Sequence, residues 1–183
     1  PFASIAKATL ASKHSIISCI TDHIRKAVDI VGSDYLEIKH PILFNFHAKL
    51  LLSMFNDPEK VDEMMLAKLM PFIENGVKSP MKSFRYSALV VISQLVLTVK
   101  LKEEVLNSLC KLLITKLRAD TAPASLCTLM VVFQQQNVQN LSKNTLKKLL
   151  RHDESIDVWK ILKDLAERTD TTKFYNVLWA ELV

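Results

Sequence analysis

Glycine is almost missing from this chain: only 2 of its 183 residues are glycine, Gly32 and Gly76. Glycine supplies the positive-φ conformations that tight β-turns and phosphate-binding loops need, and proteins use it on average at about 7%. Helices joined by short turns tolerate this scarcity, whereas β-sheets rarely do. The composition therefore favours a helical fold and disfavours a nucleotide-binding loop.

Long apolar runs are missing too. The longest, such as residues 126–133, are far shorter than the roughly 20 residues that cross a bilayer, so we expect no contact with a membrane. The chain starts at Pro1 without a signal peptide, and we interpret it as a fragment of a larger protein. Cys19, Cys110 and Cys127 are widely spaced in apolar segments, which predicts reduced core thiols of an intracellular protein.

Sequence signatures of enzymes are absent. There is no GxSxG, no Walker-type glycine loop and no HExxH. His47 lies on an apolar helical stripe, where a hydrogen-bonded core histidine is the simplest interpretation. Glu103 and Glu104 fall at a predicted helix start, where carboxylates stabilise the helix dipole. We therefore expect no enzyme, no catalytic residue, no metal, no cofactor and no small-molecule substrate.

Helical periodicity is what the sequence does contain. Apolar residues recur every three to four positions in segments separated by short connections, which predicts about nine helices. These stripes cover residues 17–31, 43–54, 65–73, 84–99, 106–117, 123–133, 146–150, 158–165 and 174–178.

Proline and glycine mark the predicted helix ends. Pro41, Pro58 and Pro123 stand where helices can begin. Gly32 is expected to end the first helix in a left-handed cap, and the third helix is expected to stop near Gly76. Pro71 lies inside a predicted helix, where it removes a backbone hydrogen bond and should bend or break the axis.

The predicted helices recur in pairs about every 40 residues, the period of HEAT and armadillo repeats. We therefore predict an all-α protein: a HEAT-like α-α superhelix of about four antiparallel helix pairs, forming a single domain over residues 1–183. The alternative is an irregular helical bundle, because the last third of the chain has shorter and less regular elements.

Two segments resemble a known family. The run AKLMPFIENGVKS at residues 67–79, followed by Phe84 and Arg85, resembles a HEAT repeat, in which a proline-containing helix, a polar turn and an arginine near the start of the second helix follow one another. Such an arginine reaches turn carbonyls or an acidic neighbour. This run, with VVFQQQNVQNLS at residues 131–142, is similar to the large HEAT-repeat subunit of the UtpA complex, a family associated with the U three small nucleolar RNA.

The resemblance implies a function that composition and periodicity do not show. It implies a non-enzymatic scaffold of the small-subunit processome in the nucleolus of the nucleus, acting in early pre-ribosomal RNA processing and ribosome biogenesis and supporting ribosomal DNA transcription by RNA polymerase I. The implied partners are other UtpA and processome subunits, with pre-ribosomal RNA as a further candidate. The alternatives are a direct RNA-binding helical module and a generic HEAT-repeat adaptor for protein interactions.

Positive charge is concentrated in the middle of the chain. The net formal charge is +5, but the stretch from Lys78 to Arg151 contains 12 Lys and Arg against 3 Asp and Glu, a net of +9. Equivalent positions of stacked repeats align, so these groups could form a stripe that attracts RNA phosphates or an acidic partner. The alternative is an ordinary solvated face. The candidate binding residues are Lys78, Lys82, Arg85, Lys143, Lys147, Lys148 and Arg151; a further basic group, Lys111, Lys116 and Arg118, lies at a helix end.

Overall fold

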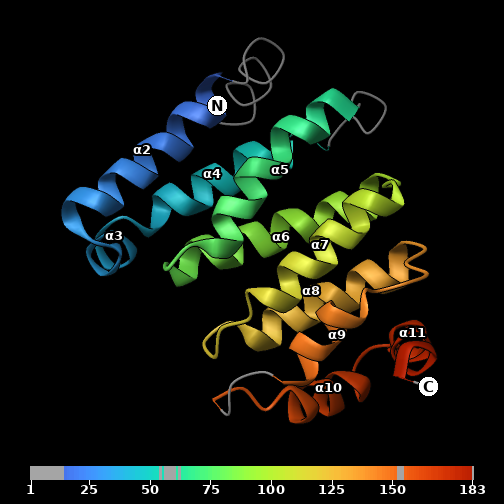
Figure 1. The fold of residues 1–183 in the computed structure, drawn as a ribbon. Helices are drawn as coiled ribbons and strands as arrows, with labels where there is room; N and C mark the ends of the chain where they lie inside the picture. Colours follow the sequence, from blue (N-terminus) through green and yellow to red (C-terminus); the bar gives the residue numbers. More distant parts are fainter. Residues whose placement is uncertain (1–14, 54, 56–60, 62, 152–154, 183) are drawn as a thin grey trace. The chain divides into compact units, whose positions relative to one another are not determined.

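The described part of the structure, a computed structural model, consists of α-helices and the connections between them (Figure 1). Ten α-helices and no strand occur in those parts, which confirms the all-α class. Backbone contacts divide the chain into two compact units, Pro1–Val99 and Lys100–Val183. The described residues are 15–53, 55, 61, 63–151 and 155–182.

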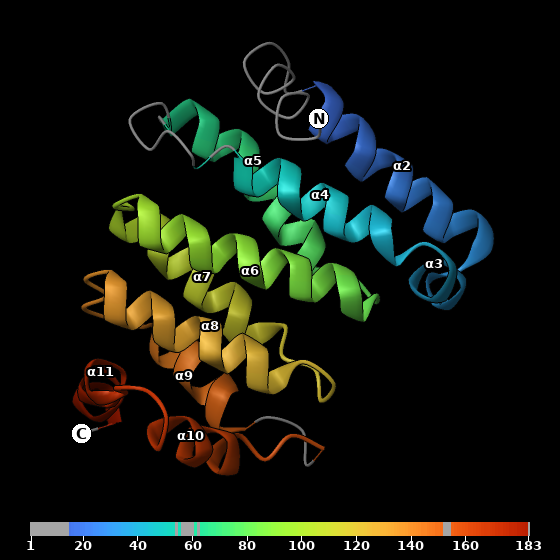
Figure 2. The same cartoon turned by 180° about the vertical axis from the view of Figure 1, so that it is seen from behind.

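In the first unit, α6 is the central helix. It packs on α5 and on α4, and α4 packs on α2 (Figure 2). Most of its circumference is buried, and its exposed side also carries apolar residues, Tyr86, Val90 and Leu97, so its sequence shows little amphipathic contrast. The helices of this unit are α2 (Ser15–Val31), α3 (Ser33–Lys39), α4 (Pro41–Ser53), α5 (Glu63–Lys78) and α6 (Lys82–Thr98).

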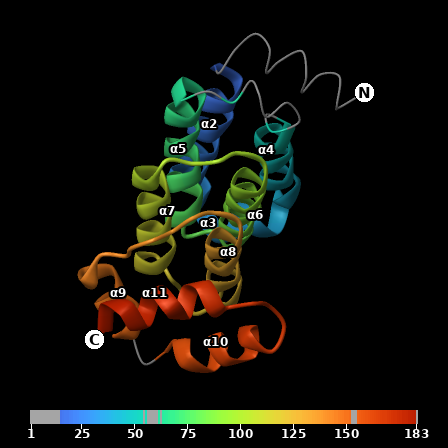
Figure 3. The ribbon, with the colours of Figure 1, turned by 90° about the vertical axis from the view of Figure 1, so that its right-hand side faces the viewer.

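In the second unit, α7 packs on α8 and α9, and α8 also packs on α10 and α11. The last two helices lie across the direction of α7 and α8 (Figure 3). This change in helix direction agrees with the irregularity expected of the last third of the chain. The helices are α7 (Glu103–Thr115), α8 (Ala122–Gln135), α9 (Lys143–Leu150), α10 (Val158–Ala166) and α11 (Thr172–Leu182).

The helix starts reproduce the 40-residue period. α5, α7 and α9 begin at residues 63, 103 and 143, and α4, α6 and α8 begin at residues 41, 82 and 122. In the first unit α2 contacts α3 and α4, and in the second unit α7 contacts α8 and α9, so a helix can pack on its next neighbour and on the one after it. This is how stacked helical repeats bury their apolar faces, and it is consistent with a HEAT-like fold.

Proline positions fit the helix starts better than the glycine positions fit the helix ends. Pro41 begins α4, and Pro123 stands in the first turn of α8. The expected helix start at Pro58 lies outside the described residues. α5 continues through Pro71 and ends at Lys78, so the proline does not break the helix.

Gly32 has the expected positive φ but not the expected cap. Its φ and ψ are 84° and 154°, which is outside the left-handed helical region and leads directly into α3. α3 itself was not among the predicted helices, because its seven residues are too few to show a helical stripe. The N-cap of α10 is Asp157, whose Oδ1 accepts a hydrogen bond from the Lys160 amide at 2.9 Å.

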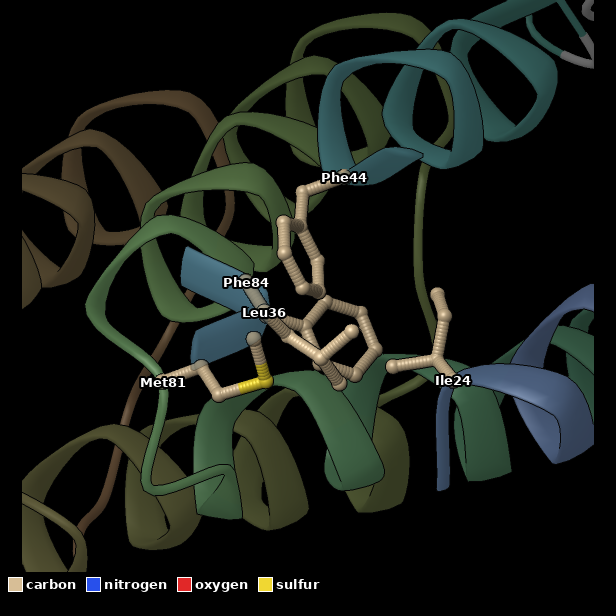
Figure 4. Packing of buried hydrophobic residues seen from close by; sticks show 5 residues of the cluster. All are labelled: Ile24, Leu36, Phe44, Met81 and Phe84. Atoms are coloured by element: carbon tan, nitrogen blue, oxygen red, sulfur yellow. The ribbon is translucent and has the colours of Figure 1, made fainter. Parts of the chain in front are cut away.

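The core of the first unit joins helices that are distant in sequence. Ile24 of α2, Leu36 of α3, Phe44 of α4 and Phe84 of α6 meet Met81 from the turn between α5 and α6 (Figure 4). The rings of Phe44 and Phe84 lie 5.7 Å apart between centroids. The short helix α3 therefore closes one side of this core with Leu36.

At Gly76, α5 comes into close contact with α6. A Cβ atom added to Gly76 would lie 2.6 Å from the Cβ of Ala88, which is closer than two carbon atoms can pack. Both residues are buried within their helices. α5 ends at Lys78, two residues past Gly76, so the expected helix end near Gly76 is confirmed within the uncertainty of helix boundaries. The glycine itself is needed for close packing rather than for a cap.

We predict that Gly76→Ala lowers the free energy of unfolding by about 1–2 kcal/mol, because overlap with Ala88 outweighs the gain of roughly 1 kcal/mol in helix propensity. Urea titration measures this change. In an Ala88→Gly background the obstructing atom is gone, and Gly76→Ala should then stabilise the protein. An equal loss in both backgrounds would show that the two helices do not meet at these positions.

Candidate nucleic-acid interface

The predicted basic residues fall into both units. Lys78, Lys82 and Arg85 belong to the first unit, and Lys143, Lys147, Lys148 and Arg151 to the second. Because the two groups belong to different units, a continuous stripe through both stays a prediction.

In the first unit, both lysines already have partners. The Nζ of Lys78 lies 2.6 Å from a carboxylate oxygen of Glu74, one turn earlier in α5. The Nζ of Lys82 lies 5.9 Å from the centroid of the Tyr86 ring, a cation–π distance. Glu74 therefore balances the charge of Lys78, while Lys82 keeps its charge and lies over the neutral ring of Tyr86.

Arg85 is a structural residue, which corrects its place among the candidate binding residues. Its exposed fraction is only 2%. Its Nη1 donates hydrogen bonds to the carbonyl oxygens of Ser79 and Pro80, at 2.7 and 2.8 Å. The guanidinium thus holds the turn between α5 and α6, as the HEAT-repeat resemblance implies, and it is buried away from any phosphate.

Sequence reasoning missed the acidic residue at this turn. The carboxylate of Glu37 in α3 accepts hydrogen bonds from the amides of Ser83 and Lys82, at 2.7 and 3.4 Å. α6 has no side-chain cap at Met81, so Glu37 satisfies amides at its start from 46 residues away. Because Glu37 lies in α3, which sequence analysis did not predict, the sequence carries no signal for this contact.

In the second unit, α9 presents its positive charge to solvent. Lys143, Lys147, Lys148 and Arg151 are all exposed. On the opposite face, Thr145, Leu146 and Leu149 are buried. Ser142 caps the helix, since its Oγ accepts from the Thr145 amide at 3.3 Å. Within the described residues, none of the four cations forms an ion pair with a carboxylate.

A groove of about 720 Å³ runs between α7 and α9. Three of the four α9 cations line it, and Lys111 of α7 faces them. The groove contains no carboxylate and no large apolar or aromatic side chain among its described lining. The lining residues are Lys111, Thr115, Ser142, Asn144, Thr145, Lys147, Lys148 and Arg151.

Lys111 could have been assigned to this site from the repeat period. Lys111 and Arg151 are 40 residues apart, and each is the ninth residue counted from the start of its repeat helix, at residues 103 and 143. Equivalent positions of stacked helices lie side by side, and both residues indeed line the groove. Lys116 and Arg118, which sequence analysis grouped with Lys111, are exposed but do not belong to the lining.

His47 is a core residue, as predicted. It is 1% exposed, its Nε2 lies 3.0 Å from Thr21 Oγ1, and its ring packs edge-on against Phe84 at 5.3 Å. Its Nδ1 has no hydrogen-bond partner among the described residues. Burial lowers the pKa of His47 from 6.5 to about 4, because the charged imidazolium would lose its hydration.

Glu103 and Glu104 lie in the first turn of α7, as predicted. Across the described residues, no three His, Cys, Asp or Glu side chains are placed to share a metal ion. Nor is any described helix long and apolar enough to cross a membrane.

Cysteine positions agree only partly with the expected core thiols. Cys110 is buried, and burial raises the pKa of its thiol to about 12. Cys127 is half-buried, whereas Cys19 is exposed, so the core assignment of Cys19 is wrong. Cys19 occupies a solvent-facing position of α2.

Comparison with known proteins identifies related chains. The sequence model of the family described as U3 small nucleolar RNA-associated protein 10 matches residues 65–182. A HEAT repeat-containing protein 1 homolog from Caenorhabditis elegans is 87% identical over all 183 residues. HEAT repeat-containing protein 1 from Homo sapiens is 25% identical over 170 residues, 92% of this chain. The chain spans only 11% and 8% of the lengths of these two relatives.

We predict that Arg85→Met lowers the free energy of unfolding by about 2–4 kcal/mol, because the carbonyls of Ser79 and Pro80 lose a charged hydrogen-bond donor that is itself buried. Arg25→Met in α2 is the matched control. Arg25 is 72% exposed and lies 3.7 Å from Asp22, so its loss should change stability by less than about 0.5 kcal/mol. Urea titration compares the two, and equal effects would contradict the structural role of Arg85.

Stability should also fall as the pH is lowered from 7 to 5. Over this range the unfolded state binds a proton at His47, with a pKa near 6.5, while the folded state, with a pKa of about 4, does not. Linkage then predicts a loss of about 2 kcal/mol from this residue by pH 5, which grows to about 3 kcal/mol as the pH reaches the folded-state pKa of about 4.

His47→Gln keeps a side chain that can bond Thr21 but does not titrate. Denaturant titrations at several pH values should therefore show a flatter dependence for the variant than for the parent chain. The same slope in both proteins would exclude His47 as its source.

Proposed function

Because the chain belongs to the U3 small nucleolar RNA-associated protein 10 family, we propose that it is a non-enzymatic helical scaffold in ribosome biogenesis. In finer terms, it acts in the nucleolus as part of the UtpA complex of the small-subunit processome. There it contributes to early pre-ribosomal RNA processing and supports transcription by RNA polymerase I. Residues 1–183 form one HEAT-like domain of a larger protein.

The observation that carries this proposal is the 40-residue recurrence of helix starts together with contacts between successive and alternate helices. Such stacking gives a long surface of side chains held at fixed spacing, and binding to that surface needs no bond chemistry. The apolar side chains that stay exposed add contact area for protein partners. They include Val90 and Leu97 on α6, with exposed fractions of 52% and 54%.

A second candidate function is direct RNA binding. It is favoured by one observation, the four exposed cations of α9 and its end, which have no carboxylate partner within the described residues. A protein scaffold can exist without this contact, so the two candidates can be tested apart.

The scaffold proposal predicts that the tagged chain retains processome subunits in nucleolar extract after nuclease treatment, measured by quantitative mass spectrometry of UtpA subunits. A variant carrying Lys147→Glu, Lys148→Glu and Arg151→Glu should retain them equally well, because protein contacts do not depend on the α9 charges. An Arg85→Met chain serves as the destabilised control. Loss of all UtpA subunits on nuclease treatment would refute the protein scaffold and leave an RNA-mediated association.

A further inference from the structure

We propose that the groove between α7 and α9 is a binding site for the sugar-phosphate backbone of single-stranded RNA. The inference deepens the second candidate function and rests on it, but it is independent of the protein scaffold. It also changes the predicted site. Lys111 and its neighbours on α7 join the α9 cations, and the first-unit residues Lys78, Lys82 and Arg85 are no longer part of it.

Charge is the first reason. Lys111, Lys147, Lys148 and Arg151 bring four positive side chains to one concave surface, and the described residues contribute no carboxylate to its lining. Like charges gathered at a groove raise the local potential and attract a polyanion. The first-unit lysines differ, because Lys78 is paired with Glu74 and Lys82 lies over Tyr86.

The neutral part of the lining is the second reason. Thr115 of α7 and Asn144 of α9 add a hydroxyl and an amide beside the cations. Hydroxyl, amide and basic side chains are the groups that contact phosphates and sugars in nucleic-acid complexes.

The absence of anchors in the described lining separates RNA from a peptide. A docked peptide usually needs a pocket for an aromatic or aliphatic side chain, and stacking on bases needs an exposed aromatic ring. Neither kind of residue belongs to the lining. The groove is therefore suited to a polyanionic backbone, and we expect little dependence on base sequence.

Fluorescence anisotropy with a labelled, unstructured RNA of about 20 nucleotides tests the proposal on the full 183-residue chain. The parent chain should bind at low ionic strength, equally well for different sequences, with affinity falling steeply as salt rises. Replacing Lys147, Lys148 and Arg151 by Glu should weaken binding at least about tenfold and reduce the salt slope by roughly 0.7 for each lost contact.

A matched control separates the groove from total charge. The changes Lys160→Glu, Lys163→Glu and Arg168→Glu reverse two lysines and one arginine that are exposed in the same unit but do not line the groove. They alter the formal charge equally, and we expect about threefold weaker binding at most. Circular dichroism should show that both triple variants keep the helical content of the parent.

A neutral single change tests the α7 wall. Lys111→Gln should weaken RNA binding about fivefold near 0.1 M salt, whereas Lys116→Gln, on an exposed residue at the end of the same helix, should have less effect. The proposal is overturned by absence of RNA binding at low salt, by equal losses in the two triple variants, or by tighter binding to an acidic phosphopeptide than to RNA.

Discussion

The hydrogen bonds from the buried guanidinium of Arg85 to the carbonyls of Ser79 and Pro80 are the interaction on which the first unit depends. They close the turn between α5 and α6. That turn delivers Met81 and Phe84 to the core shared with α2, α3 and α4. Because a buried charge is stable only when its donors are satisfied, this arginine fixes the turn in one geometry, and the close contact of Gly76 with Ala88 then sets the spacing of the two helices.

The same use of polar side chains recurs at other helix ends. Glu37 accepts from the amides that begin α6, and Gln136 Oε1 accepts from the Leu101 amide at 3.1 Å, just before α7. The side-chain Nε2 of Gln134 donates to the backbone carbonyl of Asp170 at 2.7 Å. The backbone carbonyl of Gln134 accepts from the Nζ of Lys173 at 2.9 Å, and the two bonds connect α8 to α11. The glutamine-rich segment that resembles the family therefore has a structural explanation. Polar residues bonded to backbone stabilise this fold. The cations of α9 have no such bond among the described residues and remain the candidates for contact with a partner.

Sequence reasoning predicted what depends on local periodicity. The helical class, the 40-residue period and the core position of His47 follow from spacings along the chain, and the structure confirms them. What it missed depends on tertiary contacts. α3 shows no stripe in seven residues, and the solvent-facing position of Cys19 depends on which face of α2 is covered. From the sequence, Arg85 could have been either a structural or a binding residue, and only its burial in the structure shows that it is structural. The 40-residue spacing of Lys111 and Arg151, by contrast, already predicts that they lie on facing helices.

The charges of α9 have a consequence for its own stability. Lys143 and Lys147, and likewise Lys147 and Arg151, are four residues apart, where like charges destabilise a helix by about 0.2–0.5 kcal/mol per pair. Lys143 also stands at the positive end of the helix dipole, whereas Lys147 and Lys148 in the last turn are favoured by it. The Ser142 cap and the buried side chains of Leu146 and Leu149 must offset the unfavourable part. A bound polyanion would remove the repulsion, so occupation of the groove would stabilise the short helix that forms one of its walls.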